Sequence, residues 1–126
     1  MPGVVTNFLV RWLMDDDAIQ LKTTARLQES LFVPLTAVLE LEWVLRSRYA
    51  LGKPDILLAL NTLLEVRELE IQTESAVERA LHAYRMGNAD FADCLHAGAC
   101  WSAGKTPLLT LDAKAARLAD AELLRG

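Results

Sequence analysis

The hydrophobic pattern of this chain alternates short β-rich runs with longer stretches of helical periodicity. Alternation of this kind is what a mostly parallel sheet covered by helices requires. We therefore expect an α/β sandwich whose central sheet has about four or five strands and is flanked by about six or seven helices. The runs that predict strands lie at residues 4–5, 31–33, 69–71, 108–111 and 123–124, with the 108–111 strand buried.

Proline, glycine and potential caps predict where the helices begin and end. Pro34 suits a strand end, Gly52 closes one helix, and Pro54 suits the first turn of the next. Thr36 and the Ser75–Glu78 capping box predict two helix N-caps. The expected helices lie at residues 8–14, 36–49, 54–64, 75–86, 90–103 and 114–119, with a further one after a cap at residues 15–17.

Size and charge limit the possible classes of protein. A chain of 126 residues suits a single domain, here residues 1–126. The formal charge of -4 argues against a general phosphate-backbone binder, so any contact with nucleic acid must be local or metal-mediated. No apolar run is long enough to span a bilayer and no signal segment is evident, so we expect a cytoplasmic protein with no membrane contact. Cys94 and Cys100 are expected to be reduced core thiols.

Two aspartates stand three residues apart at the start of a small, apolar helical stretch. Asp90 and Asp93 share one helix face, where two like charges cost free energy unless a cation, a basic partner or water compensates. The pair suggests half of an acidic metal site. An N-cap role is an equal alternative for Asp90, and a weaker one for Asp93 inside the helix.

The long helix at residues 36–49 offers a comparison between two glutamates. Glu42 precedes Arg46 by four residues, which predicts an ordinary surface ion pair. Glu40 has apolar and uncharged neighbours, and a carboxylate on an apolar face must be protonated, paired from elsewhere or bound to a metal. Asp112 follows a predicted strand, where a site residue and a simple helix cap are equally good interpretations.

Several converging carboxylates are the ligands expected for a hard cation. Mg²⁺ and Mn²⁺ prefer carboxylate oxygens and retain several waters. Such a site can polarise a phosphoryl oxygen and activate a water for in-line attack.

Four segments together closely resemble the PIN-domain toxins of the VapC type. The segments are VTNFLVR at 5–11, ELEWVLRSRY at 40–49, ADFAD at 89–93 and TLD at 110–112. The resemblance implies a PIN-like three-layer sandwich and a metal-dependent endoribonuclease of a toxin-antitoxin pair. It places Glu40, Asp93 and Asp112 in an acidic site for Mg²⁺ or Mn²⁺, and Asp90 beside them as a further acid. The polar residues that it implies around this site are Thr6, Asn7 and Thr110.

The first motif departs from the family pattern. The family has Asp-Thr-Asn at the end of its first strand, whereas this chain has Val5-Thr6-Asn7. Valine can neither bind a hard cation nor orient its water, so we expect impaired RNA cleavage. Two explanations of Val5 are open: a natural loss of catalysis, or a change introduced or selected while the gene was propagated.

The main alternative is a catalytically inactive PIN-like module that binds its antitoxin, and RNA as well, without cleavage. A third option is an α/β domain whose acids only cap helices. The resemblance implies a VapB-like antitoxin, toxin homodimers and toxin-antitoxin hetero-oligomers. The basic residues proposed to contact RNA are Arg11, Arg46 and Arg48, for which a solvated surface role is the alternative.

Overall fold

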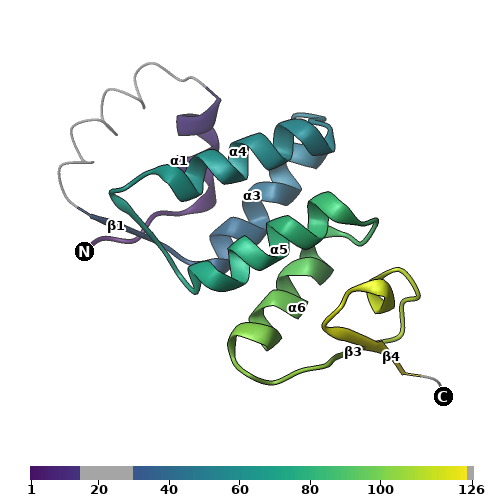
Figure 1. Ribbon diagram of the computed structural model, residues 1–126. Coiled ribbons are helices and arrows are strands. Elements are labelled where there is room, and N and C mark those ends of the chain that lie inside the picture. Colours follow the sequence, from purple (N-terminus) through teal and green to yellow (C-terminus); the bar gives the residue numbers. More distant parts are fainter. Residues whose placement is uncertain (15–29, 125–126) are drawn as a thin grey trace. The chain divides into compact units, whose positions relative to one another are not determined.

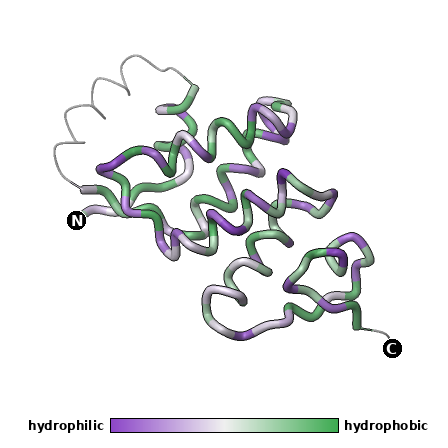
Figure 2. Tube along the Cα trace, viewed as in Figure 1, coloured by the Kyte–Doolittle hydropathy of each residue, from purple (hydrophilic) through white to green (hydrophobic). Residues whose placement is uncertain are grey.

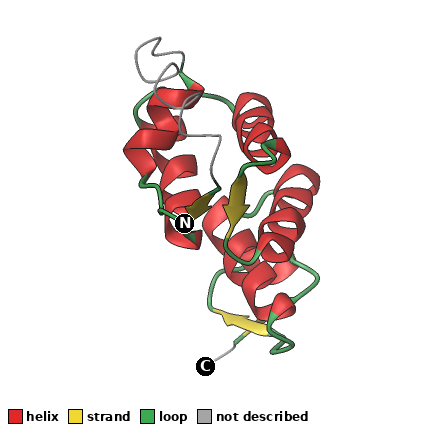
Figure 3. Cartoon of the chain, turned by 90° about the vertical axis from the view of Figure 1, so that its left-hand side faces the viewer, coloured by secondary structure: helices red, strands yellow, loops and turns green. Residues whose placement is uncertain are grey.

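The computed structural model describes residues 1–14 and 30–124, which form helices joined by short parallel strands (Figure 1). The chain divides into two compact units, Met1–Gln72 (unit 1) and Thr73–Gly126 (unit 2). The helix expected after residues 15–17 lies outside the described residues. The four described strands are arrows in Figure 3 and form two parallel pairs, one in each unit.

In unit 1, the strand β1 (Leu31–Val33) lies between two extended segments. On one side it pairs in parallel with β2 (Leu69–Ile71), with Phe32 opposite Glu70. On the other side, the N–H of Val4 donates to the carbonyl of Phe32 at 2.9 Å, and the N–H of Phe32 donates to the carbonyl of Pro2 at 2.8 Å. The strands predicted at residues 31–33 and 69–71 are confirmed, and the N-terminal segment runs beside β1.

Three helices complete the described part of unit 1: α1 (Thr6–Leu13), α3 (Leu35–Ser47) and α4 (Lys53–Glu65). Apolar side chains from all three are buried, among them Leu9, Leu41 and Leu60. Figure 2 shows the same pattern, in which hydrophobic and hydrophilic residues alternate along the helices. The helix start predicted at Pro54 is confirmed, since Pro54 lies in the first turn of α4. Gly52, expected to close the preceding helix, is instead the N-cap of α4, because α3 already ends at Ser47.

The N-cap predicted at Thr36 is wrong. Pro34 occupies that position, with φ -62° and ψ 149°, and α3 begins at Leu35. The N–H of Leu35, which has no partner within the helix, donates to Oε1 of Gln72 at 2.8 Å. A side chain that directly follows β2 therefore satisfies the start of α3, and sequence neighbours alone do not reveal such a long-range cap.

Unit 2 is built on the helices α5 (Glu74–Met86) and α6 (Phe91–Ser102), which pack closely. A Cβ atom added at Gly98 would lie 2.5 Å from the carbonyl oxygen of Ala76, so this crossing requires glycine. The rings of Tyr84 and Phe91 meet edge to face, with centroids 5.6 Å apart.

The capping box predicted at Ser75 is also wrong. The N-cap of α5 is Thr73, which has a left-handed backbone (φ 50°) and no capping bond from its side chain. The hydroxyl of Ser75, the second residue of α5, instead lies 2.8 Å from the hydroxyl of Ser102 on α6. The hydroxyl of Ser75, which the capping-box pattern assigns to the helix backbone, thus contacts the neighbouring helix α6 instead.

The C-terminal part of unit 2 contains β3 (Leu108–Thr110), the 3₁₀ helix η1 (Ala115–Arg117) and β4 (Ala121–Leu123). The strands β3 and β4 pair in parallel. The strand predicted at residues 108–111 is thus confirmed, but its predicted burial is wrong, because Leu109 is 57% exposed and Leu111 is 79% exposed.

An ion pair ties this part of unit 2 to α5. Nε and Nη2 of Arg79 donate to the two carboxylate oxygens of Asp120 at 2.6 and 2.9 Å. The hydrogen bond to Asp120 raises the pKa of Arg79 above its usual value, against a smaller opposing effect of burial. The guanidinium also lies 4.1 Å from the ring centroid of Trp101, a cation–π distance.

Within residues 1–14 and 30–124, no helix combines the length and the hydropathy that a membrane crossing requires. Cys94 and Cys100 are free thiols. Cys94 is buried, as expected, whereas Cys100 is only partly buried and is not a core residue.

Candidate active site

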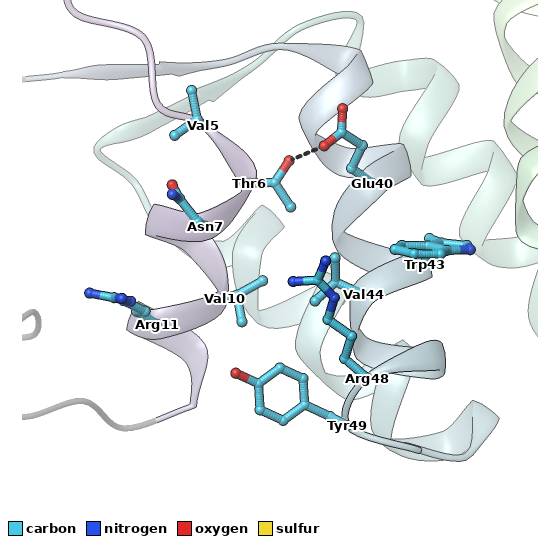
Figure 4. Close-up of a pocket in the computed structure, with 10 residues that line it drawn as sticks. All are labelled: Val5, Thr6, Asn7, Val10, Arg11, Glu40, Trp43, Val44, Arg48 and Tyr49. Carbon is cyan, nitrogen blue, oxygen red and sulfur yellow. Dashed lines mark hydrogen bonds between the residues drawn. The ribbon is translucent and has the colours of Figure 1, made fainter.

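A pocket of about 570 Å³ lies between α1 and α3 in unit 1 (Figure 4). It brings together residues from the start of the chain and residues that follow more than thirty positions later. The residues that line it are Val5, Thr6, Asn7, Val10, Arg11, Glu40, Trp43, Val44, Arg48 and Tyr49.

One end of this pocket is polar. The hydroxyl of Thr6, in the first turn of α1, donates to Oε2 of Glu40 on α3 at 3.2 Å. Asn7 lies beside Thr6 and lines the same space. Three residues that the sequence places in the site are therefore neighbours in the folded unit.

The two glutamates of α3 have the opposite environments from those expected. Glu40 is exposed, whereas Glu42 is buried, with only 3% of its surface accessible. The pairing predicted for Glu42 is present, since Nε of Arg46 donates to its Oε2 at 2.9 Å. Its assignment to the surface was wrong, because α3 carries apolar residues around much of its circumference and helical neighbours do not show which face is packed.

Val5 occupies the position directly before the polar end of the pocket. It is the N-cap residue of α1, with φ -98° and ψ 166°, and its side chain is 65% exposed. No side chain caps α1, and no acidic residue lies in its first turn. The valine thus contributes little to the core and provides no oxygen ligand at a position where a carboxylate would face the pocket.

The three arginines proposed to contact RNA differ in their surroundings. Arg11, in the last turn of α1, and Arg48, directly after α3, both line the pocket and are exposed. Arg46 is not a lining residue and binds Glu42.

In unit 2, Asp90 and Asp93 lie at the N-terminal end of α6. Asp90 is the exposed N-cap residue, but its side chain makes no capping hydrogen bond. Asp93 is half-buried in the first turn, where the helix dipole favours negative charge. Asp90 therefore occupies the predicted N-cap position, but its carboxylate makes no hydrogen bond to the backbone of α6.

Asp112 caps the turn that leads into η1. Its Oδ2 accepts a hydrogen bond from the N–H of Ala115 at 3.2 Å, and its own N–H donates to Oγ1 of Thr110 at 3.0 Å. Thr110 and Asp112, both predicted site residues, therefore lie together after β3. This hydrogen bond confirms the helix-cap interpretation of Asp112. The bond uses only one of the two carboxylate oxygens.

The donor types suit a hard divalent cation, but neither unit alone assembles a complete site. Among the described residues of each unit, no group of three or more His, Cys, Asp or Glu side chains is placed to hold a metal ion. The pocket of unit 1 offers one carboxylate, Glu40, together with the hydroxyl of Thr6 and the amide of Asn7. Mg²⁺ can be held by one or two carboxylates together with several waters, so Glu40 provides the minimum and a second acid would strengthen the site.

The family model of the PIN domain matches residues 4–121, which includes parts of both units. The chain belongs to the PIN domain family. PIN domains are generally nucleases that use divalent metals, and the expected α/β fold with short parallel strands and flanking helices is confirmed. A search of curated proteins finds no match.

Two lining residues, Trp43 and Tyr49, were not predicted as site residues. Both belong to the ELEWVLRSRY segment and are about half exposed, at 51% and 43%. An available signal was the presence of two large aromatic residues among four charged ones, but the sequence pattern does not reveal that these rings line a pocket.

Proposed function

We propose that this chain is a toxin of the VapC type, derived from a metal-dependent endoribonuclease and impaired in catalysis by Val5. The observation that supports this proposal is the pocket of unit 1. Position 5, Thr6 and Asn7 belong to the first motif of the resemblance and Glu40 to the second, and all four line the same space. Membership of the PIN domain family supports nuclease chemistry.

The proposed metal ligands are Glu40, Asp93 and Asp112, with Asp90 as an adjacent acid and Thr110 as a polar neighbour. All offer oxygen donors, which favours Mg²⁺ or Mn²⁺ over softer metals. The bound ion would supply Lewis-acid polarisation of the scissile phosphate. Of this chain's own residues, Thr6 orients Glu40 through their hydrogen bond, while Val5 leaves the first ligand position without a donor.

Restoring the carboxylate tests this proposal. We expect Val5→Asp to cleave a single-stranded RNA in Mn²⁺ about 100-fold faster than the chain with Val5, the scale on which small misplacements of a reacting group act. Val5→Asn is the matched control, because it has nearly the same shape and no negative charge. Robust, equal activity of the Val5 chain and Val5→Asp would contradict the impairment, and an inactive Val5→Asp would contradict the nuclease assignment.

The alternative is an inactive PIN-like module that binds its antitoxin, and RNA, without cleavage. The exposed, donor-free side chain of Val5 favours it. It would be supported if Val5→Asp bound RNA without cleaving it in either Mg²⁺ or Mn²⁺.

The partners that we propose are a VapB-like antitoxin, a second copy of the chain in a homodimer, and RNA, in the cytoplasm. Light scattering of the purified chain tests the homodimer directly. A mass equal to that of a single chain at micromolar concentration would contradict it.

A further inference from the structure

Two half-exposed aromatic rings lie in the pocket of unit 1. Large aromatic side chains usually bury most of their surface, yet Trp43 remains 51% exposed and Tyr49 43% exposed. Figure 4 shows the ring of Tyr49 directed into the space between α1 and α3, with the side chain of Arg48 alongside. The pocket therefore presents a flat, apolar surface that neither helix covers.

The same pocket is locally basic in a chain that is acidic as a whole. Its lining contains two guanidinium groups, from Arg11 and Arg48, and one carboxylate, from Glu40. Neither arginine makes an ion pair with any residue in the described part of the chain. Two such cations at one pocket, in a protein of net charge -4, favour a ligand that carries negative charge.

We propose that this pocket binds an unpaired nucleotide of single-stranded RNA, with a base stacked on Tyr49 or Trp43 and its phosphates held by Arg11 and Arg48. This inference rests on the proposed ribonuclease function and assigns the residues that position its substrate. A volume of about 570 Å³ suits a ligand of nucleotide size. Bases within a duplex are already stacked on one another, so a site of this kind selects single strands.

The position of the pocket gives the bound nucleotide a role. The polar pair of Thr6 and Glu40 lies at one end of the pocket, and Tyr49 and Arg48 lie toward the other end (Figure 4). A strand anchored by one base in this pocket is thereby directed past the proposed catalytic acid Glu40. The aromatic residues would be substrate-positioning residues.

Binding of a labelled RNA without metal tests the stacking contact. The probe is a fluorescent single-stranded RNA of about eight nucleotides, followed by anisotropy in EDTA, so that cleavage does not contribute. We expect Tyr49→Ala or Trp43→Ala to weaken binding about fivefold to 100-fold, and Tyr49→Phe to retain most of the affinity. Leu58→Ala is the matched control, because Leu58 is 68% exposed on α4 and does not line the pocket. Circular dichroism of each variant verifies its fold.

A second arm tests the charges and the strand preference. Arg48→Ala should weaken binding and lower the slope of log affinity against log salt by about one, whereas Arg67→Ala, an exposed arginine of the same unit outside the pocket, should change neither. The matching RNA duplex should bind more weakly than the single strand.

Three results would overturn the inference: no RNA binding, equal binding of duplex and single strand, or aromatic variants that bind like the natural chain. The first would leave a protein partner as the occupant of the pocket. Failure of this inference can be distinguished from failure of the nuclease proposal. If Val5→Asp were inactive but RNA binding still required Tyr49, the nuclease proposal would be contradicted and this binding site would be supported.

Discussion

On α3, two carboxylates two positions apart experience different surroundings. Glu42 is almost fully buried and accepts a charge-assisted hydrogen bond from Arg46, whose side chain remains 54% exposed. A buried carboxylate without such a partner would be strongly destabilising, so Arg46 is needed for the packing of α3. Glu40 faces the pocket and is free to act on a ligand.

The substitution Glu42→Gln should lower the free energy of unfolding by about 1 kcal/mol, because a charge-assisted hydrogen bond becomes a neutral one. Urea denaturation measures this change. The matched control is Glu40→Gln, an exposed position where we expect a change within about 0.5 kcal/mol. The assigned environments would be wrong if the Glu40 variant were the less stable of the two.

At the level of elements, the packing of α5 against α6 depends on the absence of a side chain at Gly98. The carbonyl oxygen of Ala76 occupies the position that a Cβ would need, and that oxygen belongs to the backbone and cannot rotate away. The edge-to-face contact of Tyr84 and Phe91 and the ion pair of Arg79 with Asp120 add specific contacts to the same unit.

Gly98→Ala should destabilise the protein by about 1–2 kcal/mol. Forcing the two helices apart costs about 1–3 kcal/mol, and the better helix propensity of alanine offsets up to about 1 kcal/mol of this. Thermal or urea unfolding would measure the loss.

Gly87→Ala is the control for this substitution. Gly87 has an extended backbone, with φ -138°, and an added Cβ would lie at an ordinary 3.5 Å from the carbonyl oxygen of Ala83. We expect a change within about 0.5 kcal/mol there. Equal effects of the two substitutions would contradict the close helix crossing at Gly98.

At the level of the whole molecule, residue 5 belongs both to the start of α1 and to the proposed metal site. Val5 lies at an N-cap position with an extended backbone and no side-chain cap. Either Val5→Asp or Val5→Asn should therefore stabilise the chain by about 1 kcal/mol in EDTA, because both side chains can accept a hydrogen bond from the first turn of α1.

Mn²⁺ should separate these two variants. A ligand that binds only the folded state at ten times its dissociation constant adds about 1.4 kcal/mol, and we expect this gain for Val5→Asp and a much smaller one for Val5→Asn. Thermal unfolding in EDTA and in Mn²⁺ measures both effects. An equal response of the two variants to Mn²⁺ would show that position 5 does not contribute a metal ligand.

Much of the local structure is determined by the sequence alone. The β-rich runs at residues 31–33, 69–71 and 108–110 form strands, and Pro54 lies in the first turn of a helix as predicted. These features depend on side-chain shape and backbone preference, which act over a few residues. The resemblance to the PIN family, confirmed over residues 4–121, also depends on sequence only.

Only the tertiary structure decides which residues become buried and which of them meet. Contacts between segments more than thirty positions apart decide several features of unit 1. They include the hydrogen bond from Leu35 to Gln72, the burial of Glu42, and the pocket that Thr6 shares with Glu40 and Tyr49. A helix with apolar residues on several sides can pack through more than one face, so local pattern leaves its orientation open. Packing against α1 and α4 selects one orientation, and that choice places Glu40 at the pocket and Glu42 in the core.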